Sequence, residues 1–403
     1  MFIITAKVRK GRIAAVAAAA AVVCGVLVAA AGLLGGRGAA ASAAVSPKGV
    51  RTNEDRIAYL ESYGWSVSSD PIAVEELIIP EQFDETYSQY LELQASQGFD
   101  LTDGGEIYYS QISSDGTSVI VCRAAGPGQD ARAEYMTLKY FGHGTQIVAE
   151  EASDGKTYIW LNSNASVDSS GEYGDNWSVS RVEFVPGALS EAGYAGETFF
   201  LNKDGQYDQQ VAIDFPARRL LVGSRKSGVR YFWIFDLDEA LALPLKTMTA
   251  TVTVGSAGSD PVTREIRARD LNDCRVLGSF SVPAGSDKEN DVYSYSHQGH
   301  EVAGNYVYFY EGNAVETGAD SFASKAYVTV FNYSGKIVVP RTEVAAVADK
   351  AGLAAAGLTT TGYAEGESLK VRDGKLYLGV ACRDGSSSNR RANILVYDCV
   401  QAE

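Results

Sequence analysis

The sequence is poor in the residues that most often build metal centres and nucleophilic active sites. It has three histidines, five cysteines and three methionines among 403 residues. A structural zinc site needs four closely spaced nitrogen or sulfur ligands, but His143 is far in sequence from His297 and His300, and the cysteines are scattered. The chain also contains no G-x-S-x-G motif and no Cys–His signature. We therefore expect no metal and no cofactor, and nothing in these motifs argues for an enzyme.

Basic residues are scarce outside the first 37 positions. The chain has 35 lysines and arginines against 50 acidic residues. Five of the basic residues (Lys7, Arg9, Lys10, Arg12 and Arg37) lie in the first 37 positions, which contain no acidic residue. The remaining 30 basic residues face all 50 acidic ones, which gives a net charge of about −20 beyond that segment. Such a body is repelled by phosphate backbones, which excludes nucleic acid as its expected partner.

One long hydrophobic run, residues 13–34, contains 22 residues and no charge. At about 1.5 Å per residue, a helix of this length spans the roughly 30 Å hydrocarbon core of a membrane. The basic tail before it, residues 1–12, is expected in the cytoplasm, which places the body outside the cell membrane. The alternative is a cleaved signal peptide and a secreted body, because Ala41-Ser42-Ala43 is an A-x-A-like site. A signal core is usually about 7–15 residues, so the length favours a single-pass anchor.

Residues 35–49 are rich in Gly, Ala and Ser and are expected to form a flexible stalk, and residues 50–105 are expected to form a small α/β module. The module contains the segments RIAYLESYGW, IIPEQFDETYSQY and QGFDL, in this order. They resemble the start of a small domain of unknown function that follows a single membrane-spanning helix in many Gram-positive bacterial proteins. The resemblance implies an extracytoplasmic, membrane-anchored location and no activity.

Beyond residue 105 the chain repeats one pattern of short alternating strands separated by turns such as Gly304-Asn305 and Ser334-Gly335. Repeats of a unit that cannot bury its own faces build a stacked or radial all-β architecture. We predict a five-bladed β-propeller over residues 106–403, with six blades as the alternative. The predicted units are 106–142, 143–206, 207–282, 290–340 and 363–402. Residues 251–270 are expected to form an inserted hairpin that projects from one face, and residues 344–358 a short helix.

A second resemblance supports this architecture. It is carried by YMTLKYFGHGTQIVAEEASDGKTYIWLNSN and WSVSRVEFVPG, and continues in AIDFPARRLLVGSR, YFWIFDLDEAL and GHEVAGNYVYFYEGN. These segments resemble the helveticin J family, the class III bacteriocins and their relatives, over roughly residues 106–400. The resemblance implies a β-propeller with antibacterial activity, or with binding at a bacterial surface.

Five polar residues stand at the predicted starts of innermost strands, where a propeller's ligands commonly bind: His143, Gln146, Gln209, His300 and Glu367. They are predicted to line a shared polar funnel that binds a ligand. The alternative is that they cap strand ends and fill a wet channel. The predicted function is a membrane-anchored, extracytoplasmic binding or antibacterial protein, with a cell-envelope component or polysaccharide as partner. The alternatives are a non-catalytic envelope protein with a structural role and a glycan hydrolase. The cysteines beyond the hydrophobic run are expected to be free.

Overall fold

A computed structural model describes the larger part of the chain from residue 96 onward. All described residues belong to one compact unit, Phe83–Glu403. The described ranges are 96–102, 105–113, 117–125, 134–167, 173–190, 196–254, 258–314, 324–358, 363–383 and 390–399. The predicted tail, membrane helix and stalk and most of the predicted α/β module lie outside these ranges. Within them, no helix combines the length and apolar character needed to cross a membrane.

Strands dominate the described residues and form five sheets. The first sheet contains, in spatial order, β1 (Ser96–Leu101), β2 (Ile107–Ile112), β3 (Ser118–Ala124), β4 (Glu134–Lys139) and β8 (Leu189–Ser190). The second contains β5 (Val148–Glu151), β6 (Thr157–Val167), β7 (Tyr173–Glu183), β9 (Glu197–Phe200), β14 (Pro261–Asp270) and β13 (Leu245–Thr253). The third contains β10 (Tyr207–Asp214), β11 (Arg219–Lys226), β12 (Val229–Asp236) and β15 (Val276–Pro283).

The last two sheets follow in chain order. The fourth contains β16 (Ser296–Ala303), β17 (Tyr306–Asn313), β18 (Lys325–Asn332) and β19 (Ile337–Glu343). The fifth contains β20 (Tyr363–Arg372), β21 (Lys375–Arg383) and β22 (Arg390–Asp398). The helices in the described ranges are α4 (Leu237–Ala242), a 3-10 turn (Leu271–Asp273), α5 (Ala345–Ala348) and α6 (Lys350–Ala355). The last two helices occupy the segment 344–358 that was predicted to be helical.

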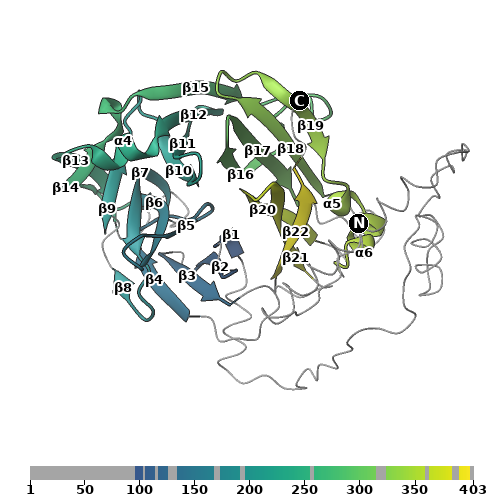
Figure 1. Ribbon diagram of the computed structural model, residues 1–403, viewed down its shortest axis with the longest axis horizontal. Helices are drawn as coiled ribbons and strands as arrows, with labels where there is room; N and C mark the ends of the chain where they lie inside the picture. The colour runs from purple at the N-terminus through teal and green to yellow at the C-terminus, as the bar shows by residue number, and fades with distance from the viewer. Residues whose placement is uncertain are drawn as a thin grey trace, which may run out of the picture. The chain divides into compact units, whose positions relative to one another are not determined.

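The five sheets surround a common centre in a propeller-like arrangement (Figure 1). The first strand of each sheet lies innermost, and these strands contact one another in the cyclic order β1, β5, β10, β16, β20 and back to β1. Four of the sheets have four or more strands, and the fifth has three described strands. The predicted all-β, propeller-like body is therefore confirmed.

Most innermost strands are irregular near their first residues. Register shifts occur in β1 between Ser96 and Gly98, in β10 between Tyr207 and Gln210, in β16 between His297 and Gly299, and in β20 between Gly366 and Leu369. Two non-glycine residues at these shifts, Asp208 and Ser368, have positive φ angles of 54° and 68°. A bulge of this kind redirects side chains locally. We call this end of the ring, where the innermost strands begin, the start rim.

Apolar cores fill the spaces between successive sheets. The first and second sheets share a cluster around Tyr108 and Leu161, and the second and third share one around Trp160 and Phe199. Phe232 and Phe309 lie in the core between the third and fourth sheets, and the core between the fourth and fifth includes Tyr310 and Leu369. Because alternate residues of a strand face opposite neighbours, the second, third and fourth sheets each contribute to two of these cores.

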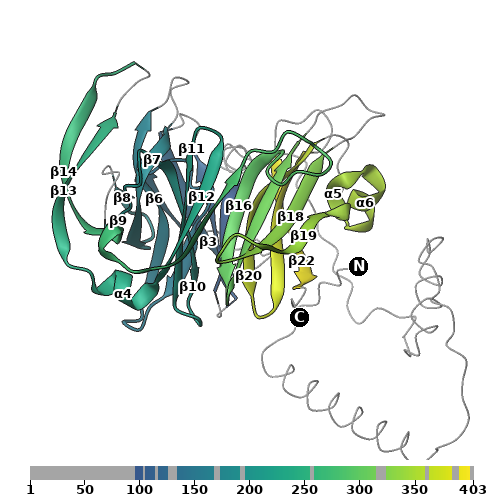
Figure 2. The same cartoon turned by 90° about the horizontal axis from the view of Figure 1, so that it is seen from above.

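Two features differ from the expected boundaries. Residues 96–101, which had been assigned to the α/β module ending at residue 105, form β1 and pair with β2 in the first sheet. The inserted hairpin runs from β13 to β14 and does not project alone from the third unit. Strand β14 pairs in parallel with β9, so the hairpin extends the outer edge of the second sheet (Figure 2). Such pairing covers backbone groups of β9 that would otherwise be exposed at the edge.

Candidate functional site

Two of the five predicted site residues are in direct contact. His300, in β16, donates its backbone N–H to Gln146 Oε1 over 3.1 Å, and Gln146 Nε2 donates to the carbonyl oxygen of His300. Both side chains are buried. Gln146 lies two residues before the start of β5, and β5 and β16 are not neighbours in the ring. This pair of hydrogen bonds therefore crosses the centre of the ring near the start rim.

The other three predicted site residues belong to three different segments of the chain. Gln209 is buried in β10 and donates to the carbonyl oxygen of Leu201. His143 is half-buried in the connection between β4 and β5. Glu367 is half-buried at the bulge of β20, and its charge contributes to a raised pKa of Tyr310, after the larger effect of burial. A polar funnel shared by all five residues stays a prediction.

Further along the inner strands, buried charges from three sheets meet at the centre. Arg372 Nη2, from β20, lies 2.9 and 3.0 Å from the two carboxylate oxygens of Asp100, from β1. Lys370 Nζ, also from β20, lies 3.2 Å from Glu301 Oε2, from β16. The side chains of Asp100, Glu301 and Lys370 are fully buried, and that of Arg372 is 20% exposed. We call these four residues the axial ion cluster.

The axial ion cluster also binds backbone groups. Asp100 accepts hydrogen bonds from the backbone N–H groups of Leu101 and Ala149, each over 2.8 Å, which ties β1 to β5. Glu301 Oε1 accepts the backbone N–H of Val302 over 3.0 Å. Burial raises the pKa of Glu301, and the neighbouring Lys370 and Arg372 oppose that shift. Two cations and two carboxylates thus compensate one another inside the ring.

A second group of charges lies at the start rim. Asp208 Oδ2 is 3.2 Å from Arg230 Nη2 and 3.3 Å from Arg225 Nε. His297 Nε2 and His300 Nδ1 are 3.2 Å apart. Burial, followed by the charge of Arg230, holds the pKa of both histidines well below the ordinary value, so both rings are neutral near pH 7. We call these five residues the rim arginine cluster.

Several buried polar atoms in or beside this cluster lack partners. Arg230 is only 4% exposed, and its Nε and Nη1 atoms have no hydrogen-bond partner among the described residues. Within the same ranges, His300 Nε2 and Gln210 Oε1 are also without a partner. Buried polar groups are almost always hydrogen-bonded, and leaving them unpaired is unfavourable. The cluster therefore retains hydrogen-bonding capacity that the described part of the protein does not use.

Aromatic rings flank the cluster on the side of the second sheet. The guanidinium of Arg225 lies 5.0 Å from the centroid of the Tyr207 ring. The rings of Tyr207 and Trp177, from β7, are 6.2 Å apart between centroids, and both residues are half-buried. Half-exposed tyrosine and tryptophan combine a flat apolar surface with a polar group, which suits binding surfaces.

The described cysteines form no disulfide with one another. Cys122, Cys274, Cys382 and Cys399 are all unbridged within the described ranges. Burial raises the pKa of Cys122 to about 12 and that of Cys274 to about 11, so both remain protonated and unreactive near pH 7. Over the described ranges, no group of three or more His, Cys, Asp or Glu residues is placed to hold a metal ion.

The sequence analysis missed the charged residues that dominate both clusters. They stand inside otherwise apolar strands, as Asp100 does in FDL, Arg230 in VRYFW and Lys370 in LKVR. A charge flanked by apolar residues in a buried strand is unusual unless the charge is paired. That pattern was the available signal, and it would have pointed to the centre of the ring.

Comparisons with known proteins find similarity to solved structures. No family model matches the chain, and no curated protein matches it. Among solved structures, an α-L-arabinofuranosidase from Lactobacillus brevis is similar over 76% of this chain and 92% of its own, with 11% identity and a TM-score of 0.40. The polysaccharide lyase Uly1 is similar over 75% of this chain and 89% of its own, with 8% identity and a TM-score of 0.31. Similarity this low carries no inference about activity or ligand.

Proposed function

We propose that this chain is a non-catalytic binding protein of the cell envelope, held by residues 13–34 in the membrane with its propeller outside. The ligand is a cell-envelope polysaccharide that docks on the start rim. One observation carries the proposal: in the rim arginine cluster, the buried Nε and Nη1 atoms of Arg230 have no hydrogen-bond partner among the described residues. Unused buried donors favour a ligand that completes them.

The proposal includes five blades, one for each sheet. The cyclic contacts of β1, β5, β10, β16 and β20 support it, because each sheet supplies one strand to the ring. The final strand, β22, pairs with β21 and so belongs to the fifth sheet. Closure then depends on contact between the fifth and first blades.

A second candidate function is antibacterial. The helveticin J-like segments between residues 135 and 240 favour it, and cleavage after Ala43 would release the body into the medium. The two candidates differ in location. Peptides from upstream of Ala43 in the membrane fraction, identified by mass spectrometry, support the envelope role. A protein that begins at Ala44 and occurs only in the medium contradicts the anchor and favours release.

The direct test of binding uses the full chain in detergent and purified cell-wall glycans, assayed by co-sedimentation. We expect the wild type to sediment with insoluble glycans and the Arg225→Gln variant to do so less. Arg218→Gln is the matched control, because Arg218 is a similarly exposed, ion-paired arginine that pairs with Asp238 instead of Asp208. Equal sedimentation of the three proteins, or none, would contradict binding at the start rim.

A further inference from the structure

The start rim keeps buried hydrogen-bonding atoms of both kinds, donors and acceptors, without partners. Arg230 is 4% exposed, and Gln210, in β10, is 6% exposed. Among the described residues, Nε and Nη1 of Arg230 and Oε1 of Gln210 have no hydrogen-bond partner. The two nitrogens can only donate a hydrogen bond, and the amide oxygen can only accept one. A ligand that completes this site must therefore both accept and donate hydrogen bonds.

One carboxylate holds these two side chains together. Asp208 Oδ2 lies 3.2 Å from Arg230 Nη2, and Asp208 Oδ1 lies 3.5 Å from Gln210 Nε2. Gln210 Nε2 also donates to Thr145 Oγ1 over 3.0 Å. The amide nitrogen of Gln210 and one nitrogen of the Arg230 guanidinium are thus occupied within the protein. The remaining atoms of the same two groups are the ones left for a ligand.

Two aromatic rings continue the site toward the second sheet. The guanidinium of Arg225 contacts Asp208 and lies 5.0 Å from the centroid of the Tyr207 ring. The ring centroids of Tyr207 and Trp177 are 6.2 Å apart, and both residues are half-buried. We call Trp177 and Tyr207 the aromatic pair. A ring that is partly open to solvent offers flat apolar surface to the C–H groups of a ligand. This part of the start rim therefore combines hydrogen-bonding atoms with an apolar surface.

We propose that this part of the start rim binds an uncharged sugar ring, whose hydroxyl groups bond to Arg230 and Gln210 and whose C–H face lies on the aromatic pair. The inference rests on the proposed glycan-binding function and names the class of sugar that the site takes. A hydroxyl group both donates and accepts, so it can bond to both side chains. An ionised acid group only accepts, which would leave Gln210 Oε1 unpartnered and place a second anion near Asp208. A cation only donates, which would leave the nitrogens of Arg230 unpartnered.

Ligands that differ in charge and in ring structure test the proposal. Four are uncharged rings, the methyl β-glycosides of D-glucose, D-galactose, D-mannose and N-acetyl-D-glucosamine. D-glucuronate is a charged ring, and D-sorbitol is an uncharged open chain. Binding to the full chain in detergent is measured by saturation-transfer NMR, which also identifies the ligand protons that lie closest to the protein. We expect at least one uncharged ring to bind about threefold tighter than both sorbitol and glucuronate, with the strongest saturation at its ring C–H protons.

Variants assign the binding to these residues. Trp177→Ala is expected to weaken binding of the uncharged sugar by about threefold to tenfold, whereas Trp177→Phe keeps a ring and should retain most of the affinity. Gln210→Met removes the unpartnered acceptor, and Arg230→Lys removes the unpartnered nitrogens but keeps a cation beside Asp208. Each should weaken binding by about threefold to tenfold. Tyr135→Ala, at an exposed ring on β4, is the control and should leave binding unchanged. Thermal melting of each variant identifies any loss due to misfolding.

The outcomes separate this inference from the proposed function. If cell-wall glycans co-sediment with the protein but glucuronate or sorbitol binds as tightly as every uncharged ring, the sugar class is wrong and the binding function stands. The same holds if none of the small ligands binds, or if Trp177→Ala, Gln210→Met and Arg230→Lys all bind normally. If an uncharged ring binds but no cell-wall glycan does, the sugar site stands and the envelope function is wrong. No binding of any glycan or small ligand overturns both.

Discussion

Successive sheets of the ring are joined by apolar cores, but the closing contact between the fifth and first sheets is built differently. The four cores between neighbouring sheets contain large buried side chains such as Trp160, Phe232 and Tyr310. Among the described residues of the first and fifth sheets, no comparable apolar cluster joins the two. The ion pair between Asp100 and Arg372 joins them instead, close to the centre.

The difference shows how local and distant parts of the chain are held together. Sheets that are adjacent in sequence bury alternating apolar residues between them. The resulting hydrophobic stabilisation grows with the buried area. The ion pair connects residues 272 positions apart and fixes the two ends of the ring in one relative register. A buried pair adds little net stability, but it strongly penalises any arrangement in which one partner is left alone. We infer that the apolar cores stabilise the ring and that the ion cluster specifies its closure.

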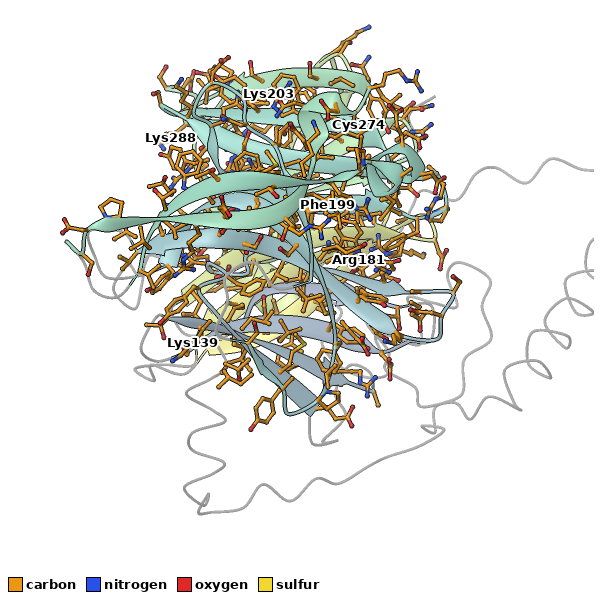
Figure 3. All side chains as sticks on the ribbon, turned by 90° about the vertical axis from the view of Figure 1, so that its left-hand side faces the viewer. Lys139, Arg181, Phe199, Lys203, Cys274 and Lys288 are labelled. Atoms are coloured by element: carbon orange, nitrogen blue, oxygen red, sulfur yellow. The ribbon has the colours of Figure 1, made fainter. Side chains whose placement is uncertain are left out.

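The largest effect is expected from opening an apolar core. Phe199, labelled in Figure 3, belongs to β9. Its side chain is fully buried, and its ring centroid lies 4.9 Å from that of Trp160. Phe199→Ala removes this contact and leaves a cavity between the second and third sheets. We expect the free energy of unfolding to fall by about 3–5 kcal/mol, measured by urea denaturation. Leu245→Ala, at a side chain exposed on the hairpin, is the control and should change it by less than about 0.5 kcal/mol. Equal effects would contradict the assigned core.

The next largest effect is expected from disrupting the ion pair that closes the ring between the first and fifth sheets. Arg372→Met keeps the bulk of the side chain but leaves the buried carboxylate of Asp100 without its cation. Removing one partner of a buried pair costs about 3–5 kcal/mol, and we expect the lower end because Arg372 is 20% exposed. Hydrogen exchange should show faster exchange in β1 and β20, while β11 and β12 stay protected.

A paired change sharpens this test. The double variant Arg372→Met, Asp100→Asn removes both charges and should recover part of the lost stability, because no buried charge is left unpaired. Lys375→Ala breaks an exposed pair with Asp398 and serves as the control, with little change in stability expected because exposed ion pairs contribute little. A loss of stability in the double variant equal to the sum of the losses in the two single variants would show that the charges act separately.

A third test concerns the buried histidines of the rim arginine cluster, which are kept neutral, in contrast to the paired charges of the axial ion cluster. Burial, followed by the charge of Arg230, lowers the pKa of His297 and His300, with smaller contributions from Arg225 or Lys370. As the pH falls below about 6.5, the ordinary histidine value, the unfolded chain binds protons that the folded chain does not. We therefore expect the free energy of unfolding to decrease from pH 7.5 to pH 5.5 in urea titrations. The decrease should be smaller in His297→Gln, and an identical pH dependence would count against a neutral His297.

Much of the fold could be predicted because its signals are local. The turns at Gly304 and Gly335, each with a positive φ, and the alternating strands around them were found from residue type and spacing alone. Strand β1 was misassigned because its short sequence resembles the end of a different module. The pairing of β14 with β9 was missed since it joins residues 70 positions apart in parallel, and no turn between them sets the register.

The site was predictable only in part for a similar reason. The positions of Gln146 and His300 at strand starts suggested a shared location, and the two residues do meet. Arg225 and Arg230 flank the turn between β11 and β12, which in sequence resembles any polar hairpin. Their importance comes from Asp208 and the histidines, which other strands bring to them. Such proximity follows from the ring and cannot be obtained from spacing along the chain.

The smallest expected effect concerns the added hairpin at the outer edge of the second sheet. Arg269, in β14, lies 3.0 Å from Glu197 in β9, and Glu197 in turn lies 3.5 Å from Arg181 in β7. Arg269→Ala removes the outermost cation of this series of ion pairs. We therefore expect the free energy of unfolding to fall by about 1 kcal/mol or less. Hydrogen exchange should accelerate in β13 and β14 but not in β6 or β7, because the hairpin is the last element of its sheet. Arg275→Ala, at an exposed pair with Glu239, is the control and should alter neither the stability nor the hydrogen exchange of the hairpin. Faster exchange throughout the second sheet would instead show that the hairpin is an integral part of that sheet.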